Sequence, residues 1–439
     1  MALSPSAFPS ARRLAVPAVA LGVLSLAALA RAAEAPRRLT LAEAVARAEQ
    51  GGFDALAAEA AVRAAEADGE RARRLPNPVF TGAWLRSTSV PVPGGTTMSD
   101  GYAVAGSDQG AVEGIASGKR SLRIDGAEAA LATARSGRDD ALRVVRRETA
   151  RGYYDVLLAE AVARVLAEVA DSWERTLELA DERLRFGAGS RVEHARVEVQ
   201  ALEAAQALAA AGADVARARS TLQVLLGGGP LDGVVLDGTL EGPVPGWAAT
   251  ADLPTLRAAA AGRPDVSAAR ADLDRAQAAL DLARRGRLPD VALLAGYTRQ
   301  GPDVAPVTPP TLSLGAAFEL PVFSQRQGEI ARADSERASA AIALARAEAR
   351  AAADVDAAWA ALAAARERVT RMETVLRDRS RQARDLVRYQ YRQGAVSLLD
   401  LFDAERTALE VELENAQGLY ALRIAVVELE AAVGRTAAP

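Results

Sequence analysis

The sequence predicts a mainly α-helical fold with a small β part, organised as two internal structural repeats. Three observations indicate this: a helix–turn–helix motif that occurs twice, two very long heptad-patterned segments, and four short strand signals at equivalent points of the two halves. Aromatic residues make up only 4% of the 439 residues, while Ala, Leu, Arg and Glu dominate. That composition favours long helices that pack through small side chains.

The repeat is clearest at two motifs. The segment from Gly187 to Glu193 returns as the segment from Gly394 to Asp400, 207 residues later (394 − 187). Upstream, Arg74-Leu-Pro-Asn77 returns as Arg287-Leu-Pro-Asp290, 213 residues later (287 − 74). A period of this length, about half the chain, predicts a duplicated supersecondary unit instead of a solenoid.

The predicted division follows from these motifs and from a Gly/Pro-rich break that begins at Gly227. Each repeat is expected to hold a helix, a strand pair and a long helical hairpin. The expected parts are a signal peptide at 1–32, the first repeat at 39–227, a linker at 228–250 and the second repeat at 251–434.

The N-terminus predicts export. Arg12 and Arg13 precede an apolar run at 14–30 that ends in small residues, the pattern of a secretory signal peptide. A transmembrane helix is the alternative, but the run is short and contains Pro17 and Gly22. The sequence has no cysteine, which excludes disulfides, thiolate chemistry and an N-terminal lipid on Cys.

Two segments, at about 125–185 and 328–391, predict helices far longer than a globular domain needs. The first would be roughly 90 Å long at 1.5 Å per residue. Apolar or small residues recur in it every three and four positions, a period of 3.5 that implies left-handed supercoiling. The first series runs from Leu142 through Val145, Thr149, Gly152 and Val156 to Leu184, and the second includes Val355, Ala358, Leu362, Ala365, Val369, Met372 and Leu376.

Each tip motif predicts a reversal between two long helices. A glycine ends the descending helix, a serine caps the ascending helix, and an acidic residue three positions later completes a capping box. These residues are Gly187, Ser190 and Glu193 in the first repeat, and Gly394, Ser397 and Asp400 in the second.

Four strands are predicted, as one two-stranded hairpin in each half. Their ranges are Val79–Thr88, Gly101–Asp108, Val291–Thr298 and Thr311–Leu320. Four strands cannot close a barrel, for which about eight is the smallest number. An exported chain with four strands of this length therefore shares a barrel with copies of itself, twelve strands in a trimer, or forms a small sheet that caps a helical bundle. The spacing alone leaves both open.

The chain resembles the TolC-type outer-membrane efflux protein family over nearly all of its mature length. The segments that carry the resemblance are Leu39–Ala48, Leu75-Pro-Asn-Pro-Val79, Leu320-Pro-Val-Phe323, Arg388–Gly394 and Ser397–Arg406. Each motif is loose by itself, but their order and duplication are specific. One departure is the lack of a clear Leu-Pro-Leu-Phe-like segment after the second strand, where Gly118-Lys-Arg120 is the nearest remnant.

The resemblance implies a homotrimer: a transmembrane β-barrel of twelve strands in the outer membrane, continued across the periplasm by a long α-helical coiled-coil barrel. It also implies a channel that works with a periplasmic adaptor and an inner-membrane pump in efflux of metal cations or drugs. The second tip resembles the heavy-metal-exporting branch as well as drug exporters, with a slight preference for metals.

The resemblance also implies site residues. Aspartates that match Asp400 and Asp403 ring the channel entrance in that family, and a tyrosine that matches Tyr391 bonds across helices. Alternatively, the aspartates only favour a helix N-terminus and Tyr391 only packs. The tips at Gly187, Ser190, Gly394 and Ser397 are the expected docking points for the adaptor.

Other classes of function find little support. His194 is the one histidine of the sequence, which excludes a His-rich metal site, and no Ser/His/Asp set can be argued from it. Neither an enzyme nor a cofactor is therefore expected. Gly227-Gly-Gly229 lacks the Lys-Ser/Thr that a phosphate loop needs. A net charge of −4 does not suggest a nucleic-acid binder. The remaining alternative is a periplasmic coiled-coil adaptor or structural tether.

Overall fold

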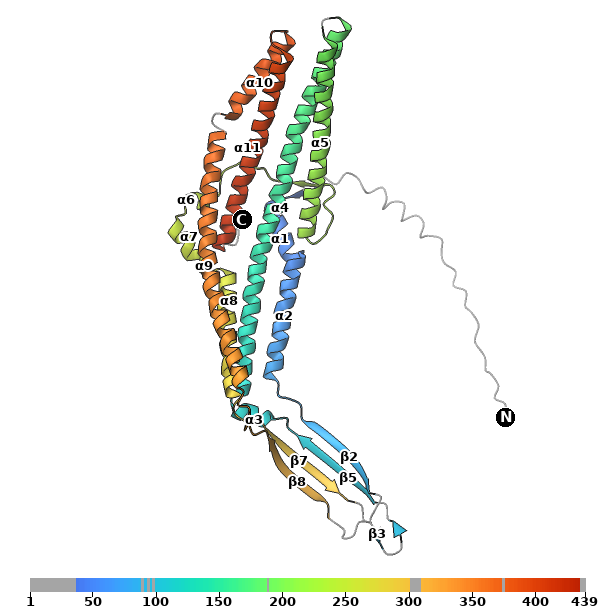
Figure 1. The fold of residues 1–439 in the computed structure, drawn as a ribbon, viewed down its shortest axis with the longest axis vertical. Coiled ribbons are helices and arrows are strands. Elements are labelled where there is room, and N and C mark those ends of the chain that lie inside the picture. Colours follow the sequence, from blue (N-terminus) through green and yellow to red (C-terminus); the bar gives the residue numbers. More distant parts are fainter. Residues whose placement is uncertain are drawn as a thin grey trace, which may run out of the picture.

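The computed structural model is an elongated molecule with a small sheet at one end and two helix reversals at the other (Figure 1). It describes residues 37–87, 91–92, 95–96, 99–187, 189–300, 309–372 and 376–434. The predicted signal peptide at 1–32 lies outside these residues.

Long helices form most of the molecule. The first half contains α1 (Leu41–Gly51), α2 (Phe53–Arg73), α3 (Ala111–Ala116), α4 (Lys119–Arg185) and α5 (Arg191–Leu225). The second half contains α6 (Gly246–Thr250), α7 (Leu253–Ala260), α8 (Pro264–Arg285), α9 (Gln327–Arg371), α10 (Arg377–Arg392) and α11 (Leu398–Val433). With its 67 residues, α4 is about 100 Å long. Its counterpart is described as two helices, α9 and α10, and residues 373–375 between them lie outside the described part.

The heptad pattern identifies the packed face of the long helices. In α9 the predicted positions Val355, Leu362 and Val369 are buried, together with the alanines between them. In α4 the buried positions include Val145, Thr149, Gly152 and Val156. Met372, the next position of the series, is also buried, whereas Leu376 is 47% exposed as the N-cap residue of α10.

Four strands form one antiparallel sheet at the end of the molecule, in the order β2-β5-β7-β8. Their bounds are Val79–Ser87 for β2, Ser99–Ser107 for β5, Val291–Arg299 for β7 and Thr311–Phe318 for β8. The two hairpins predicted from the two halves therefore lie side by side in one sheet. The short strands β3 (Pro91–Val92) and β4 (Gly95–Thr96) pair beyond it.

A second, parallel pairing ties the start of the described chain to the segment between the repeats. Strand β1 (Arg37–Leu39) pairs with β6 (Val234–Leu236). The hydroxyl of Tyr153, on α4, donates to the carbonyl oxygen of Leu39 at 3.0 Å. This pairing was not predicted, because its two strands lie nearly 200 residues apart.

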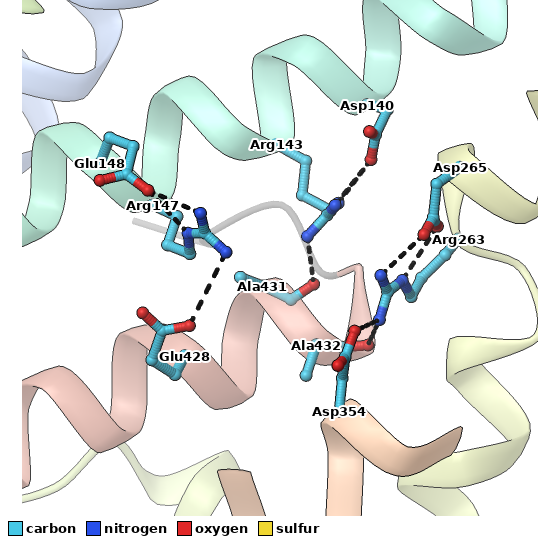
Figure 2. A network of polar contacts seen from close by, with 10 residues as sticks. All are labelled: Asp140, Arg143, Arg147, Glu148, Arg263, Asp265, Asp354, Glu428, Ala431 and Ala432. Carbon is cyan, nitrogen blue, oxygen red and sulfur yellow. Dashed lines mark hydrogen bonds and ion pairs between the residues drawn. The ribbon is translucent and has the colours of Figure 1, made fainter. Parts of the chain in front are cut away.

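At a seam halfway along the molecule, one arginine from each repeat binds the end of α11 (Figure 2). Arg143 of α4 donates to the carbonyl oxygen of Ala431 at 3.2 Å. Arg263, which is 4% exposed, donates to the carbonyl of Ala432 at 3.4 Å and to Asp354 of α9 at 2.9 Å. Burial alone would raise the pKa of Asp265, but the hydrogen bond and charge of Arg263 outweigh it and lower that pKa.

In the part of the chain that the structure describes, no helix is both long and apolar enough to cross a membrane.

Candidate functional site

The four-stranded sheet has one apolar face. Directly paired residues of antiparallel strands point to the same side. Register places ten apolar residues on that side: Phe80, Trp84, Tyr102, Val104, Val291, Leu293, Tyr297, Leu312, Leu314 and Phe318. Leu314 is 80% exposed and Phe80 is 74% exposed. Aromatic rings lie near both ends of this face, as they do at the two interfaces of outer-membrane strands.

The opposite face carries mostly small or polar residues. It includes Thr81, Ala83, Ala103, Ala105, Thr298, Thr311, Ser313 and Ala317. Nine-residue strands with this alternation match the length and pattern of tilted membrane strands. Among the described residues, the outer strands β2 and β8 each pair with one neighbouring strand, so their outer backbone groups have no strand partner there.

The first tip joins α4 to α5. Gly187 has a φ of 73°, in the left-handed region that favours glycine. The hydroxyl oxygen of Ser190 accepts the N–H of Val192 at 3.2 Å and caps α5. The predicted capping box with Glu193 is wrong. A capping carboxylate would have to turn back to the start of its own helix. The Glu193 carboxylate points away instead, because it accepts a hydrogen bond from Tyr391 of the second hairpin.

The second tip joins α10 to α11 and does form a capping box. Gly394 has a φ of 74°. The Ser397 hydroxyl oxygen accepts the N–H of Asp400 at 3.3 Å, and Asp400 Oδ2 accepts the N–H of Ser397 at 2.9 Å. The Ser397 hydroxyl also donates to Asp400 Oδ2 at 2.7 Å. These bonds with the Ser397 side chain and backbone lower the pKa of Asp400, which stays ionised at neutral pH.

Tyr391 and Arg183 connect the two hairpins just behind the tips, and we call this set of contacts the tip lock. The Tyr391 hydroxyl donates to Glu193 Oε1 at 2.8 Å. Arg183 lies 4.9 Å from the Tyr391 ring centroid and donates to the carbonyl oxygens of Tyr391, at 2.9 Å, and Arg392, at 3.1 Å. Tyr391 is 4% exposed. Burial, and then the bond to Glu193, raise the pKa of Tyr391 to about 12, so it remains a donor at physiological pH.

Arg183 and Glu193 were missed as members of this lock. Arg183 lies in the last turn of α4, where a basic residue is common because it complements the helix end. Glu193 lies in the first turn of α5, where an acidic residue is equally common. Both residues had a local explanation, so nothing in the sequence indicated a partner more than 190 residues away.

Ion pairs hold most of α10 against α11. Tyr391 is the one buried residue among those that the structure describes in α10. Arg388 pairs with Glu405 at 2.7 Å, and Arg377 and Arg381 both pair with Glu412. The two glutamates are 6% and 9% exposed. In the second hairpin, buried ion pairs therefore add to the apolar contacts around Leu401.

Asp403 lies one helical turn beyond Asp400 on α11. Its side chain is 70% exposed and forms an ion pair with Arg406 at 3.1 Å. An exposed pair at this spacing contributes little to stability. Asp400 is held by its cap, so the two carboxylates lie near each other on one exposed helix face but in different environments.

Among the described residues, no group of three or more His, Asp or Glu side chains is arranged to hold a metal ion. His194 Nε2 lies 2.5 Å from Asp181 Oδ1, which explains the one histidine as a partner of a neighbouring helix.

Comparison with known proteins gives a consistent result. The model of the outer membrane efflux protein family matches residues 255–435. The cobalt-zinc-cadmium resistance protein CzcC of Cupriavidus metallidurans is 24% identical over 329 residues, which cover 72% of this chain and 74% of that protein.

Solved structures share the fold over nearly the whole chain. The CmeC outer membrane channel of Campylobacter jejuni matches with a TM-score of 0.76 and 17% identity, covering 90% of this chain and 85% of that one. CusC matches with a TM-score of 0.73 and 18% identity, covering 90% and 92%. The second half of the chain therefore matches the outer membrane efflux protein family, and nearly the whole chain shares the fold of these solved channel structures.

Proposed function

We propose that three copies of this chain form a channel that lets substrates leave passively through the periplasm and outer membrane, as part of a tripartite efflux system. The observation that carries this function is the open four-stranded sheet, with two unpaired edges and an exposed apolar face. Its partners are two further copies, a periplasmic adaptor and an inner-membrane pump. As a passive pore of this family, the chain is not an enzyme.

Closure of the sheet into a barrel explains both its unpaired edges and its exposed apolar face. A strand edge is stable in a membrane only when another strand pairs with it, because no water is present to satisfy its backbone groups. Pairing of β8 with β2 of the next copy gives twelve strands in a trimer and leaves no edge. The apolar face then meets lipid and the small or polar face lines the pore. A periplasmic adaptor or tether, the alternative function, would not contact lipid and so would not need an exposed apolar face.

We propose divalent metal cations as the cargo. The similarity to a cobalt-zinc-cadmium resistance protein supports this, and so does the exposed Asp403 beside Asp400 on α11. Acidic side chains at a constriction favour cations over anions. A comparison of metal and drug tolerance in a strain that lacks the gene, with and without this protein, tests the proposal. Restored drug tolerance with unchanged metal tolerance would reject it.

We also propose the division into a first repeat at 39–227, a linker at 228–250 and a second repeat at 251–434. Each repeat contains one tip, and the tips lie at the end farthest from the sheet (Figure 1). The four tip residues proposed for adaptor docking are Gly187, Ser190, Gly394 and Ser397.

The trimer interface can be tested with cysteine pairs, because the chain has no cysteine of its own. Thr81→Cys on β2, combined in turn with cysteine at Ser313, Gly315 or Ala317 on β8, is expected to give covalent trimers for at least one pair. All four positions lie on the same face of the sheet. Three positions on β8 are tried because a single chain does not define the register between β8 and β2 of the next copy. The measurement is mass in denaturing gels after oxidation.

Thr81→Cys with Thr298→Cys is the matched control, because β7 is an interior strand. This pair should give no covalent trimer. A detergent-independent monomer, or equal cross-linking of the control, would contradict the proposed channel.

Replacing Gly187 and Gly394 with Val is expected to impair export while the trimer remains folded. Both glycines have left-handed backbone, and neither would have a neighbour within 4 Å of an added Cβ, so the effect is backbone strain at the tip and not a clash in the core. Gly246→Val, at a glycine with similar free space but no positive φ, is the control. Full export by the double variant would argue against docking at the tips.

A further inference from the structure

The repeated Arg-Leu-Pro motif has no role in the channel described so far. Arg74-Leu75-Pro76 follows α2 and leads into β2, and Arg287-Leu288-Pro289 follows α8 and leads into β7. Each motif therefore marks the point where a helix of the periplasmic part becomes a strand of the barrel (Figure 1). The proline accounts for the end of the helix, but no structural role has been given to the arginine and the leucine of the motif.

Both arginines are exposed. In the described part of the chain, neither guanidinium has a hydrogen bond or ion pair, in contrast to neighbouring Arg73, which pairs with Glu70 and Glu128. Leu75 is 48% exposed and Leu288 is 45% exposed. An arginine side chain without a described partner thus lies beside a half-exposed leucine at the same point of both repeats.

The second copy of the motif lies at a basic pocket. A cavity of about 530 Å³ is lined by Leu122, Asp281, Arg284, Arg285, Arg287 and Leu288. Arg284 lies 3.6 Å from Asp281, which leaves Arg285 and Arg287 without a carboxylate partner among the described residues. The pocket therefore combines uncompensated positive charge with apolar surface.

The position of both motifs relative to the apolar face is fixed by the chain. Val79 and Val291 begin the strands, five residues after Arg74 and four after Arg287. An extended residue spans at most about 3.5 Å, so each arginine lies within roughly 17 Å of its strand. Its long side chain can reach toward the interface, as arginines beside membrane segments do. The motifs thus flank the periplasmic edge of the apolar band.

We propose that the two Arg-Leu-Pro motifs bind the headgroups of anionic phospholipids in the periplasmic leaflet. The guanidinium matches the geometry and charge of a phosphodiester, and the leucine enters the upper acyl region. A trimer would present six such sites around its circumference, a ring that fixes the depth of the barrel in the bilayer. The inference rests on the proposed channel, because it requires the apolar face to meet lipid.

The test uses the whole trimer, purified in mild detergent and depleted of lipid. Native mass spectrometry counts bound lipids while phosphatidylglycerol or phosphatidylcholine is added. The variants are Arg74→Gln with Arg287→Gln, and Leu75→Ser with Leu288→Ser. Arg185→Gln with Arg191→Gln is the matched control, because it removes two exposed arginines near the first tip, far from the sheet.

Wild type and the control are expected to bind phosphatidylglycerol more tightly than phosphatidylcholine. The Arg74/Arg287 variant should lose this preference, with affinity lower by about fivefold per arginine removed, and the leucine variant should weaken both lipids. Equal binding by wild type and the Arg74/Arg287 variant would overturn the proposal. Displacement of the lipid by inorganic phosphate at equal concentration would overturn it too, because the site would then be a free-anion site.

Single-channel current of the same preparations separates this proposal from the proposed function. The Arg74/Arg287 variant should still insert and conduct, since its strands are unchanged. If the Arg74/Arg287 variant conducts and its lipid binding is unchanged, the headgroup sites alone are rejected. If the wild-type protein neither inserts nor conducts, the channel is rejected, and the headgroup sites with it.

Discussion

Combining Tyr391→Phe with Arg183→Ser is expected to raise the resting conductance of the trimer several-fold. The pair removes the hydrogen bond to Glu193 and both bonds from Arg183 to the end of α10. At about 1 kcal/mol for each hydrogen bond, the loss is about 3 kcal/mol, which changes a ratio of closed to open states by roughly a hundredfold. Tyr391 is the one described α10 residue that is buried, and the nearby pair of Arg388 with Glu405 ties α10 to its own hairpin and not to the first one.

Single-channel current in a planar bilayer measures this effect. Tyr389→Phe with Arg392→Ser is the control, because Tyr389 lies on the same helix and is 61% exposed. It should behave as wild type. Tyr391 remains protonated below its raised pKa of about 12, so the lock contributes its full stability below pH 10 and loses it only as the pH rises toward 12. An unchanged conductance in the lock variant would show that the two hairpins are held by their other contacts.

Replacing Asp400 and Asp403 with Ala is expected to abolish block of the channel by a trivalent cation added from the periplasmic side. In a trimer the two residues supply six carboxylates near one opening, and close negative charges attract multivalent cations. Cation selectivity should fall as well, while the trimer remains assembled. The measurement is single-channel current with the cation added to each side in turn.

Single variants separate the roles of the two aspartates. Asp403→Ala should remove most of the block, because that carboxylate is 70% exposed and shares only one ion pair. Arg406→Ala should strengthen the block, because it frees the Asp403 carboxylate from its ion pair. Asp400→Asn should change the block less but loosen the cap at Ser397, with the loss largest above the usual Asp pKa because the folded pKa is lowered. Block that survives the double replacement would leave both residues as helix-start residues.

Local patterns allowed much of the fold to be predicted from the sequence. The Leu-Pro breakers and, for the last strand, period-2 alternation placed the four strands within about two residues of their observed bounds, and the heptad series identified the buried face of α9. The capping box at Ser397 was also predicted, because it involves residues three positions apart. Each of these features depends only on neighbours in the chain.

Features that depend on distant partners were not predicted. The pairing of β1 with β6 and the seam at Arg263 both join residues far apart in the sequence. The resemblance implied a bond of Tyr391 across helices, but not that Glu193 is its partner. Lys119, the only lysine of the chain, is another example. It is 6% exposed and pairs with Glu113 at 3.2 Å and Asp290 at 2.7 Å, where α4 meets the start of β7.

The arginine seam at the end of α11 has a consequence for the order in which the exported chain can fold. The carbonyls that Arg143 and Arg263 bind lie 288 and 169 residues later in the sequence, in the last turn of the last helix (Figure 2). Local helices and hairpins form early, whereas contacts of such separation form late. Until the C-terminal turn has crossed the inner membrane, the two arginines lack these carbonyls, and Arg143 can pair with Asp140 and Arg263 with Asp265 and Asp354. We therefore expect α11 to dock fully against α4 only when secretion is complete, so that a truncated chain leaves this part of the molecule open to periplasmic proteases.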